Sequence, residues 1–224
     1  MTRINILDGG GPVDVEWIDV INNATGLASS HSFSVDTGSG VSNKTVILAV
    51  HYRAAASTNA RIGSATIDGV SASILRQDAL DAGTEFSEDN CIAFLGAKVS
   101  SGDASLPIVI NATGGNIGIV YTGSYKVRNL LSLTPVDVGG GATGVTGTID
   151  GITRNVDCLE GGVVFGGVGK TNPGTFTQGV TDDYNTDGVS AGHHLVTADE
   201  LNRAVRYQRT SVTIYVAMSV VSLR

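Results

Sequence analysis

The chain has 224 residues, which is enough for one large β-domain or two small ones, and for a sizeable core. Glycine reaches 30 residues against 4 prolines, and aromatic residues make up only 5%, so small and β-branched side chains must fill the core. The net charge of −7 argues against nucleic acid as a partner, because phosphate binding needs a basic stripe, and no apolar run approaches the roughly 20 residues of a membrane span.

The N-terminal part reads as a short lead-in followed by a strand. Residues 1–12 are glycine-rich and lack the apolar stretch of a signal peptide, so we expect a flexible lead-in and a chain made in the cytoplasm. From Val13 to Ile21 apolar and polar residues alternate, which predicts a half-buried strand. The alternation places Trp17, the only tryptophan, on the inner face of that strand.

The next stretch carries the strongest β signal of the first half. Lys44–Tyr52 is a nearly continuous apolar run, rich in β-branched residues and too short to favour a helix. Ile62–Ile67 and Val70–Leu75 follow, and the Asp68-Gly69 turn between them is typical of a hairpin. Similar turn signals recur about every 8 to 12 residues, which is the spacing of a β-sandwich or barrel.

The second half begins with a segment of different composition. Pro135–Ile152 is dominated by glycine and threonine, and we expect an exposed arm or a crossover rather than a domain boundary. Gly161–Gly169 predicts a core strand whose glycines let another backbone approach closely. Ser211–Leu223 places five apolar residues on one face and predicts a central closing strand.

One short helix is expected between these last two strands. Thr197 and Glu200 have the spacing of a capping box, in which each side chain satisfies a free amide at the start of a helix. Leu201, Ala204 and Val205 would then share one face, which predicts a helix near 198–207. The complete expectation is an all-β fold: an antiparallel, jelly-roll-like β-sandwich of about 10–13 strands, forming a single domain over 13–224.

One acidic stretch resembles half of a calcium loop. Asp183, Asn185 and Asp187 alternate with other residues before a glycine, and a hard cation prefers oxygen donors in such a pattern. The twelfth position of the loop should be a glutamate, but it is His194 here, so an exposed polar turn is the alternative reading. Calcium is the one ion suggested by the sequence; no other cofactor is expected. His193 and His194 would point to opposite faces of a strand and cannot share one metal ion there.

The other sequence motifs typical of enzymes are incomplete or absent. Gly166–Thr171 ends like a phosphate-binding loop, but Val164 occupies the position where the pattern needs a glycine. The two cysteines, Cys91 and Cys158, lie in apolar contexts and are expected to be buried free thiols. No Gly-x-Ser-x-Gly motif or assignable pair of carboxylates is present, so we expect no enzyme and nominate no catalytic residue.

Several stretches resemble β-sandwich proteins on the virion surface of tailed bacteriophages. These are the strand Val46–Arg53, the hairpin Ile62–Leu75, the Gly-Gly-Val-Val strand at Gly161–Val164 and the terminal Ser222–Arg224. The resemblance implies a capsid decoration, a head spike or a tail-attached module without cofactors. It also implies assembly in the host cytoplasm into the virion, capsid or tail proteins as partners, and a homo-oligomer, with jelly-roll sandwiches favouring trimers.

The alternative function is a carbohydrate-binding or receptor-binding tail adhesin that recognises a host-surface glycan. Sugar sites use exposed aromatic side chains beside polar groups. The aromatic candidates are Tyr52, Phe86, Tyr184 and Tyr207. A glycan hydrolase is the third reading, and no acid pair can be named for it.

Overall fold

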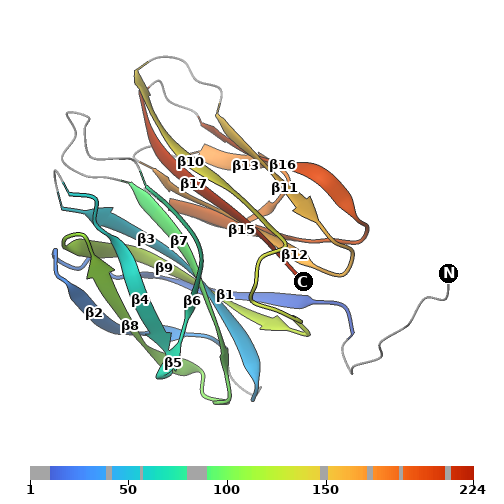
Figure 1. The fold of residues 1–224 in the computed structure, drawn as a ribbon, viewed down its shortest axis with the longest axis horizontal. Helices are drawn as coiled ribbons and strands as arrows, with labels where there is room; N and C mark the ends of the chain where they lie inside the picture. Colours follow the sequence, from blue (N-terminus) through green and yellow to red (C-terminus); the bar gives the residue numbers. More distant parts are fainter. Residues whose placement is uncertain are drawn as a thin grey trace.

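The structure is a computed structural model that describes residues 11–38, 42–55, 58–79, 90–146, 151–170, 174–186, 189–209 and 213–224 (Figure 1). Within these ranges the chain forms seventeen β-strands and no helix. The strands are β1 (Asp14–Asn22), β2 (Ser30–Asp36), β3 (Lys44–Ala54), β4 (Arg61–Ile67), β5 (Val70–Ser71), β6 (Ser73–Ala79), β7 (Cys91–Val99), β8 (Ser105–Thr113), β9 (Ile117–Arg128), β10 (Asp137–Thr146), β11 (Ile152–Cys158), β12 (Val163–Lys170), β13 (Gly174–Gln178), β14 (Thr181–Thr186), β15 (Val189–Leu195), β16 (Glu200–Arg209) and β17 (Thr213–Leu223). The predicted all-β antiparallel fold is confirmed, with more strands than the expected ten to thirteen.

The strands form four antiparallel sheets, two from each half of the chain. Sheet A has the order β1-β9-β3-β7-β6, and sheet B has the order β2-β8-β4-β5. Sheet C has the order β10-β17-β12-β15-β14, and sheet D has the order β11-β16-β13. Figure 1 shows the blue-to-green half, made of A and B, beside the yellow-to-red half, made of C and D.

Three apolar cores fix the sheets in the order B, A, C, D. The first core lies between sheets B and A, the second between A and C, and the third between C and D. Sheets A and C are therefore covered on both faces, whereas B and D each have one outer face. The predicted β-sandwich is confirmed and takes the form of two sandwiches that share a middle core, whereas the expectation of one domain over 13–224 stays a prediction.

Burial on both faces explains the continuous apolar runs of the sequence. In β3, Val46 and Leu48 face the first core while Ile47 faces the second. In β12, Phe165 faces the second core and Val164 faces the third. A strand with one solvated face alternates apolar and polar residues, but a strand between two other sheets has no polar face, and its sequence loses the alternation.

The predicted helix near 198–207 is wrong, because this segment is strand β16, paired with β11 on one side and β13 on the other. A helix would bury Leu201 together with Val205, yet Leu201 is 81% exposed. Val205 and Tyr207 are fully buried instead, at the two-residue period of a strand. Glu200 does not cap a helix; its carboxylate accepts hydrogen bonds from Nη1 of Arg203 at 2.6 Å.

The glycine- and threonine-rich segment Pro135–Ile152 is not an arm over the part that the structure describes. Its residues 137–146 are strand β10, which pairs with β17 over its whole length. The glycines are needed because other strands of the same chain pass close on both faces of β10. A Cβ at Gly139 would meet the carbonyl oxygen of Asn155 at 2.9 Å, and a Cβ at Gly140 would overlap the carboxylate of Asp78.

Candidate functional site

The residues of the expected calcium loop lie mostly on strand β14. Asp183 sits at a β-bulge, and its Oδ2 is 2.7 Å from Nδ1 of His193. The amide of Asn185 donates to the carbonyl of Gly174, and its Oδ1 accepts from the Ser190 hydroxyl at 2.9 Å. Asp187 lies outside the described residues. The calcium site stays a prediction, and in the described ranges no three His, Cys, Asp or Glu side chains are grouped to hold a metal ion.

The two neighbouring histidines face opposite sides of sheet C, as the strand geometry requires. His193 contacts the rings of Tyr125 and Phe165 in the core between sheets A and C. His194 lines a hollow of about 490 Å³ near sheet D, together with Arg203 and the 176–182 segment. Burial, and then the charge of Arg203, lower the pKa of His194, so this ring is held in its neutral form.

The buried cysteines agree with expectation, and the aromatic candidates do not line a sugar site. Both Cys91 and Cys158 are free and buried. Tyr52, Tyr184 and Tyr207 are buried in the cores, and Phe86 lies outside the described residues. Trp17 is on the inner face of β1, as the alternation predicted, because it pairs with Tyr125 and stacks on Tyr184, and its side chain remains 37% exposed.

A β-bulge lies directly after Trp17 in β1. Trp17 pairs with Tyr125 on β9, and the next paired residue of β1 is Asp19, opposite Ser124, so Ile18 is an extra residue. Trp17 precedes the bulge and keeps the face of Val13 and Val15, toward the core between sheets A and C. Beyond the bulge the faces are reversed, and Val20 instead of Asp19 lies on the side of that core.

Trp17 is supported from behind by residues of the second sandwich. Its ring stacks on that of Tyr184, with 6.3 Å between the ring centres and 28° between the planes. The Tyr184 ring lies over Gly123, where a Cβ would overlap it. The Tyr184 hydroxyl is 3.1 Å from Nε2 of His51 in strand β3. Burial raises the pKa of Tyr184 well above its ordinary value, so the phenol stays protonated and available for this hydrogen bond.

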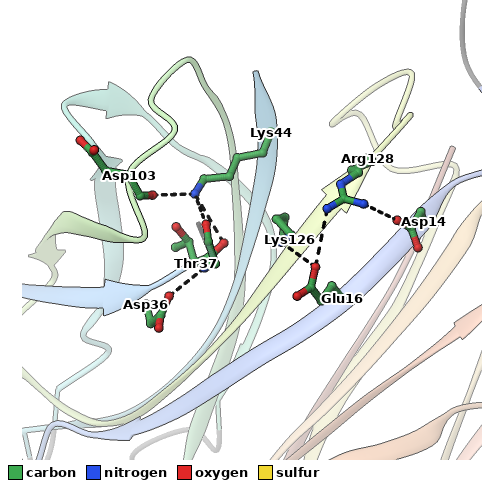
Figure 2. Close-up of polar contacts among 9 residues, drawn as sticks. Asp14, Glu16, Asp36, Thr37, Lys44, Asp103, Lys126 and Arg128 are labelled. Atoms are coloured by element: carbon green, nitrogen blue, oxygen red, sulfur yellow. Dashed lines mark hydrogen bonds and ion pairs between the residues drawn. The ribbon is translucent and has the colours of Figure 1, made fainter. Parts of the chain in front are cut away.

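A buried lysine ties two loops together near the Glu16–Lys126 pair (Figure 2). Lys44 has no exposed surface, and its Nζ donates to the carbonyl oxygens of Gly38 and Asp103, both at 2.7 Å, and of Thr37 at 3.5 Å. Burial, and then the charge of Lys126, lower the pKa of Lys44. The lysine thereby holds the segment after β2 against the loop before β8.

A second lysine belongs to a charge network on strands β1 and β9. Nζ of Lys126, which is 4% exposed, lies 2.6 Å from Oε2 of Glu16. Nη2 of Arg128 is 3.7 Å from the same oxygen, and Nη1 is 3.1 Å from Oδ2 of Asp14. Figure 2 shows these side chains next to the Lys44 cluster. Cross-strand pairing explains their proximity, since Glu16 is opposite Lys126 and Asp14 is opposite Arg128.

These elements border a polar cleft of about 320 Å³ at the end of sheet A. We call it the Trp17 cleft, and its lining residues are Glu16, Trp17, Ile18, Asp36, Gly38, Ala104 and Lys126. The titratable groups of this lining are two carboxylates and one ammonium. No serine, cysteine or histidine contributes to this lining in the described part of the chain.

A third polar cluster joins the two sandwiches. Asp78, in β6 of sheet A, is 7% exposed and accepts a hydrogen bond from the hydroxyl of Ser219 in sheet C at 2.7 Å. The guanidinium of Arg76 binds the same carboxylate through Nε at 2.8 Å and Nη2 at 2.6 Å. The missing side chain of Gly140 leaves the space that Asp78 occupies. This cluster serves to attach the two halves of the chain.

Comparisons with known proteins add little to this geometry. No family model matches the chain, and no curated protein matches it. Among solved structures, the chain is similar to dimeric latent PorU from Porphyromonas gingivalis, with 10% identity and a TM-score of 0.38. The similarity covers 93% of this chain and 22% of that one, and it is too low to carry an argument about function. No helix in the described ranges is long and apolar enough to cross a membrane.

Proposed function

We propose that this chain is a non-enzymatic structural protein of a bacteriophage virion surface that acts through protein–protein assembly at the capsid or the tail. The observation that supports assembly is the open edge of strand β10. This edge differs from most other edges of the four sheets, and the difference is of the kind that separates a protected edge from one used for pairing.

Most edge strands have a structural feature that hinders pairing with a strand of another chain. A register shift interrupts the pairing of each of β1, β6, β11, β13 and β14 with its neighbour. In sheet B, β5 has only two residues, and β2 pairs without a register shift over seven residues that end at the charged Asp36. Strand β10, in contrast, pairs with β17 over ten residues without a register shift, and residues 138–146 include no charged residue. Bulges, short length and charge are the usual means of blocking an edge, and β10 has none of them.

One hydrogen bond shows which backbone N–H and C=O groups of β10 point away from β17. The carbonyl of Gly140 accepts from Nε of Arg154 at 2.9 Å, so it points away from β17. Because the strand is regular, the N–H and C=O groups of Ala142, Gly144 and Thr146 point the same way. No strand of the described ranges pairs with this side of β10. A strand of a neighbouring subunit would satisfy these groups by extending sheet C.

Replacing Gly144 with proline tests this edge. The variant removes one outward N–H, so we expect oligomers or particle-bound protein to be lost while the free energy of unfolding changes by less than about 1 kcal/mol, because edge strands tolerate proline. The matched control is Thr143→Pro, one residue earlier, which removes an N–H that points toward β17. That control should lower the unfolding free energy by about 3 kcal/mol. Light scattering over a range of concentrations measures the mass, and urea unfolding measures the stability.

The particle itself tests the proposed location. Particles that lack this chain should bind the purified protein at a fixed number of copies, and cryo-microscopy should place those copies on the capsid or along the tail. A chain that stays monomeric at all concentrations and binds no particle would contradict the proposal. Density at the tail tip alone would favour the adhesin instead.

A further inference from the structure

We infer that the partner of strand β10 is the β10 strand of a second copy of this chain, related to the first copy by a two-fold axis. The inference rests on the proposed assembly through this edge and adds its partner, its symmetry and its register. Two antiparallel copies of β10 would join the five-stranded C sheets of both subunits into one continuous sheet. Such a contact uses the same surface on both copies and closes on itself, so it gives a dimer in place of the trimer expected from the sequence.

Arg154 divides the outer edge of β10 into an occupied part and a free part. Its Nε donates to the carbonyl oxygen of Gly140 at 2.9 Å, and a Cβ at Gly141 would lie 2.7 Å from its Nη2. The guanidinium therefore occupies the edge at these two residues. Over 142–146 the outward backbone groups have no partner among the described contacts, so this segment is the part of the edge that a second strand can reach.

The free part of the edge selects one register for the pairing. In an antiparallel pair the outward groups of one strand face those of the other, so even-numbered residues of both copies must lie opposite each other. A pair centred on Gly144 sets this residue opposite Gly144 of the partner subunit, and sets Ala142 opposite Thr146 of the partner subunit. Every outward group of 142–146 is then paired, and the carbonyl of Gly140 stays with Arg154. A register centred one or two residues earlier would bring that occupied carbonyl into the contact.

The composition of β10 suits pairing with itself. Across a two-fold axis each residue meets a near neighbour from its own sequence, so a charged residue would face the same charge and weaken the contact. Residues 138–146 include no charged residue. At the axis itself two glycines meet, so no side chains collide there. A second copy therefore satisfies this edge without a complementary feature from another protein.

The edges of sheets A and D lie on the same side of the molecule as β10 and would flank the paired strands. Strand β6 is an edge of sheet A and β11 is an edge of sheet D, and both pack against β10 and β17. A register shift interrupts the pairing of each of them within its own sheet, whereas β10 is regular. Only β10 is therefore suited to continue a ladder across the axis. The two-fold axis would set sheet A beside sheet A of the partner subunit, and sheet D beside sheet D.

Disulfide trapping in the whole chain tests the position of the axis. In Gly144→Cys the Cα atoms of the two introduced cysteines would be about 5.5 Å apart, within the range of about 4.4–6.8 Å that a disulfide needs. Oxidised glutathione, which takes up the two electrons, should then give a covalent dimer on a non-reducing gel. The matched control is Ala142→Cys, on the same face of β10, whose two copies would be offset by four residues, or about 13 Å along the strand. We expect at least tenfold more covalent dimer from Gly144→Cys than from this control or from wild type, whose Cys91 and Cys158 are buried.

A mixture of two variants tests the register. Ala142→Cys and Thr146→Cys should each stay uncrosslinked alone, but an equimolar mixture should give a covalent dimer, because each residue faces the other across the axis. This mixture also decides the question if Gly144→Cys fails to fold, which circular dichroism checks. Light scattering of the wild type should show the mass rising with concentration from 22.9 kDa to twice that value.

The outcomes separate this inference from the proposed function on which it rests. Crosslinking of Ala142→Cys alone, or no crosslinking in either Gly144→Cys or the mixture, would overturn the two-fold pair. If the wild type still binds particles in that case and Gly144→Pro abolishes the binding, assembly through β10 stands and its partner is a strand of another protein. If the wild type stays monomeric and binds no particle, the inference and the proposed function are both wrong.

Discussion

Gly140→Ala is expected to lower the free energy of unfolding by about 3 kcal/mol, because it inserts an atom where the two sandwiches are packed together. A Cβ at this position would overlap Oδ2 of Asp78. The carboxylate cannot move aside without losing its hydrogen bonds to Arg76 and Ser219. The added methyl group therefore either breaks this buried cluster or pushes sheet C away from sheet A.

Gly102→Ala is the matched control for this variant. No heavy atom lies within 4 Å of a Cβ at Gly102, and its φ is not in the left-handed region, so the change should stay within about 0.5 kcal/mol of zero. Urea unfolding followed by circular dichroism measures both variants. Equal stability of the two variants would mean that Asp78 does not lie against β10, and the order of the four sheets would have to be reconsidered.

Lys44→Met is expected to cost about 2 kcal/mol of stability at neutral pH. Methionine keeps most of the apolar stem but leaves the carbonyl oxygens of Gly38, Asp103 and Thr37 without their shared donor. Buried acceptors that lose a partner cost about 1–3 kcal/mol each, and relief of the buried charge offsets part of this loss. Lys98→Met is the control, because within the described residues the Lys98 ammonium contacts an exposed carbonyl oxygen, that of Leu131, at 3.4 Å.

Lys44→Met is also expected to change how the free energy of unfolding depends on pH. Burial lowers the pKa of Lys44, so between that lowered pKa and the ordinary 10.5 the unfolded chain holds more protons on this group than the native chain does. The contribution of Lys44 therefore increases with pH through this window and is lost as pH falls through the native pKa. The buried tyrosines Tyr52, Tyr125 and Tyr184 have raised pKa values and act in the opposite direction above pH 10. The difference between wild type and Lys44→Met removes the tyrosine contribution. If this difference does not vary between pH 8 and 10.5, Lys44 is not the buried group described.

The strands could be predicted from the sequence wherever a local pattern determined them. The apolar runs of β3, β12 and β17 could be predicted from composition alone, because a strand buried on both faces has few polar positions. The stacking of four sheets could not be predicted, since it depends on which of two apolar faces meets which sheet. The segment of β16 was misread for a related reason: Leu201, Ala204 and Val205 fit a helical period, and only the pairing with β11 and β13 shows that the segment is a strand.

The candidate site was harder to predict than the fold. Trp17 and Tyr184 are far apart in the chain, and the pairing of β1 with β9 and the space left by Gly123 bring their rings together. Glu16 opposite Lys126 is likewise a result of strand register, which the sequence does not state. Asp183 had the spacing of a calcium ligand, but its actual neighbour, His193, comes from the adjacent strand. The spacing of residues within one segment predicts contacts inside that segment, whereas each of these contacts joins residues of two or more segments.

The core between sheets A and C has a consequence for how this chain can change over evolutionary time. Ile47, Phe94 and Tyr125 from the first half pack there with Phe165 and Val221 from the second. Separating the halves would expose apolar surface on both, so neither half is suited to be duplicated, exchanged or inherited as a separate module. Substitutions on one side of this core must be matched on the other, and the two halves are bound to diversify as a single unit.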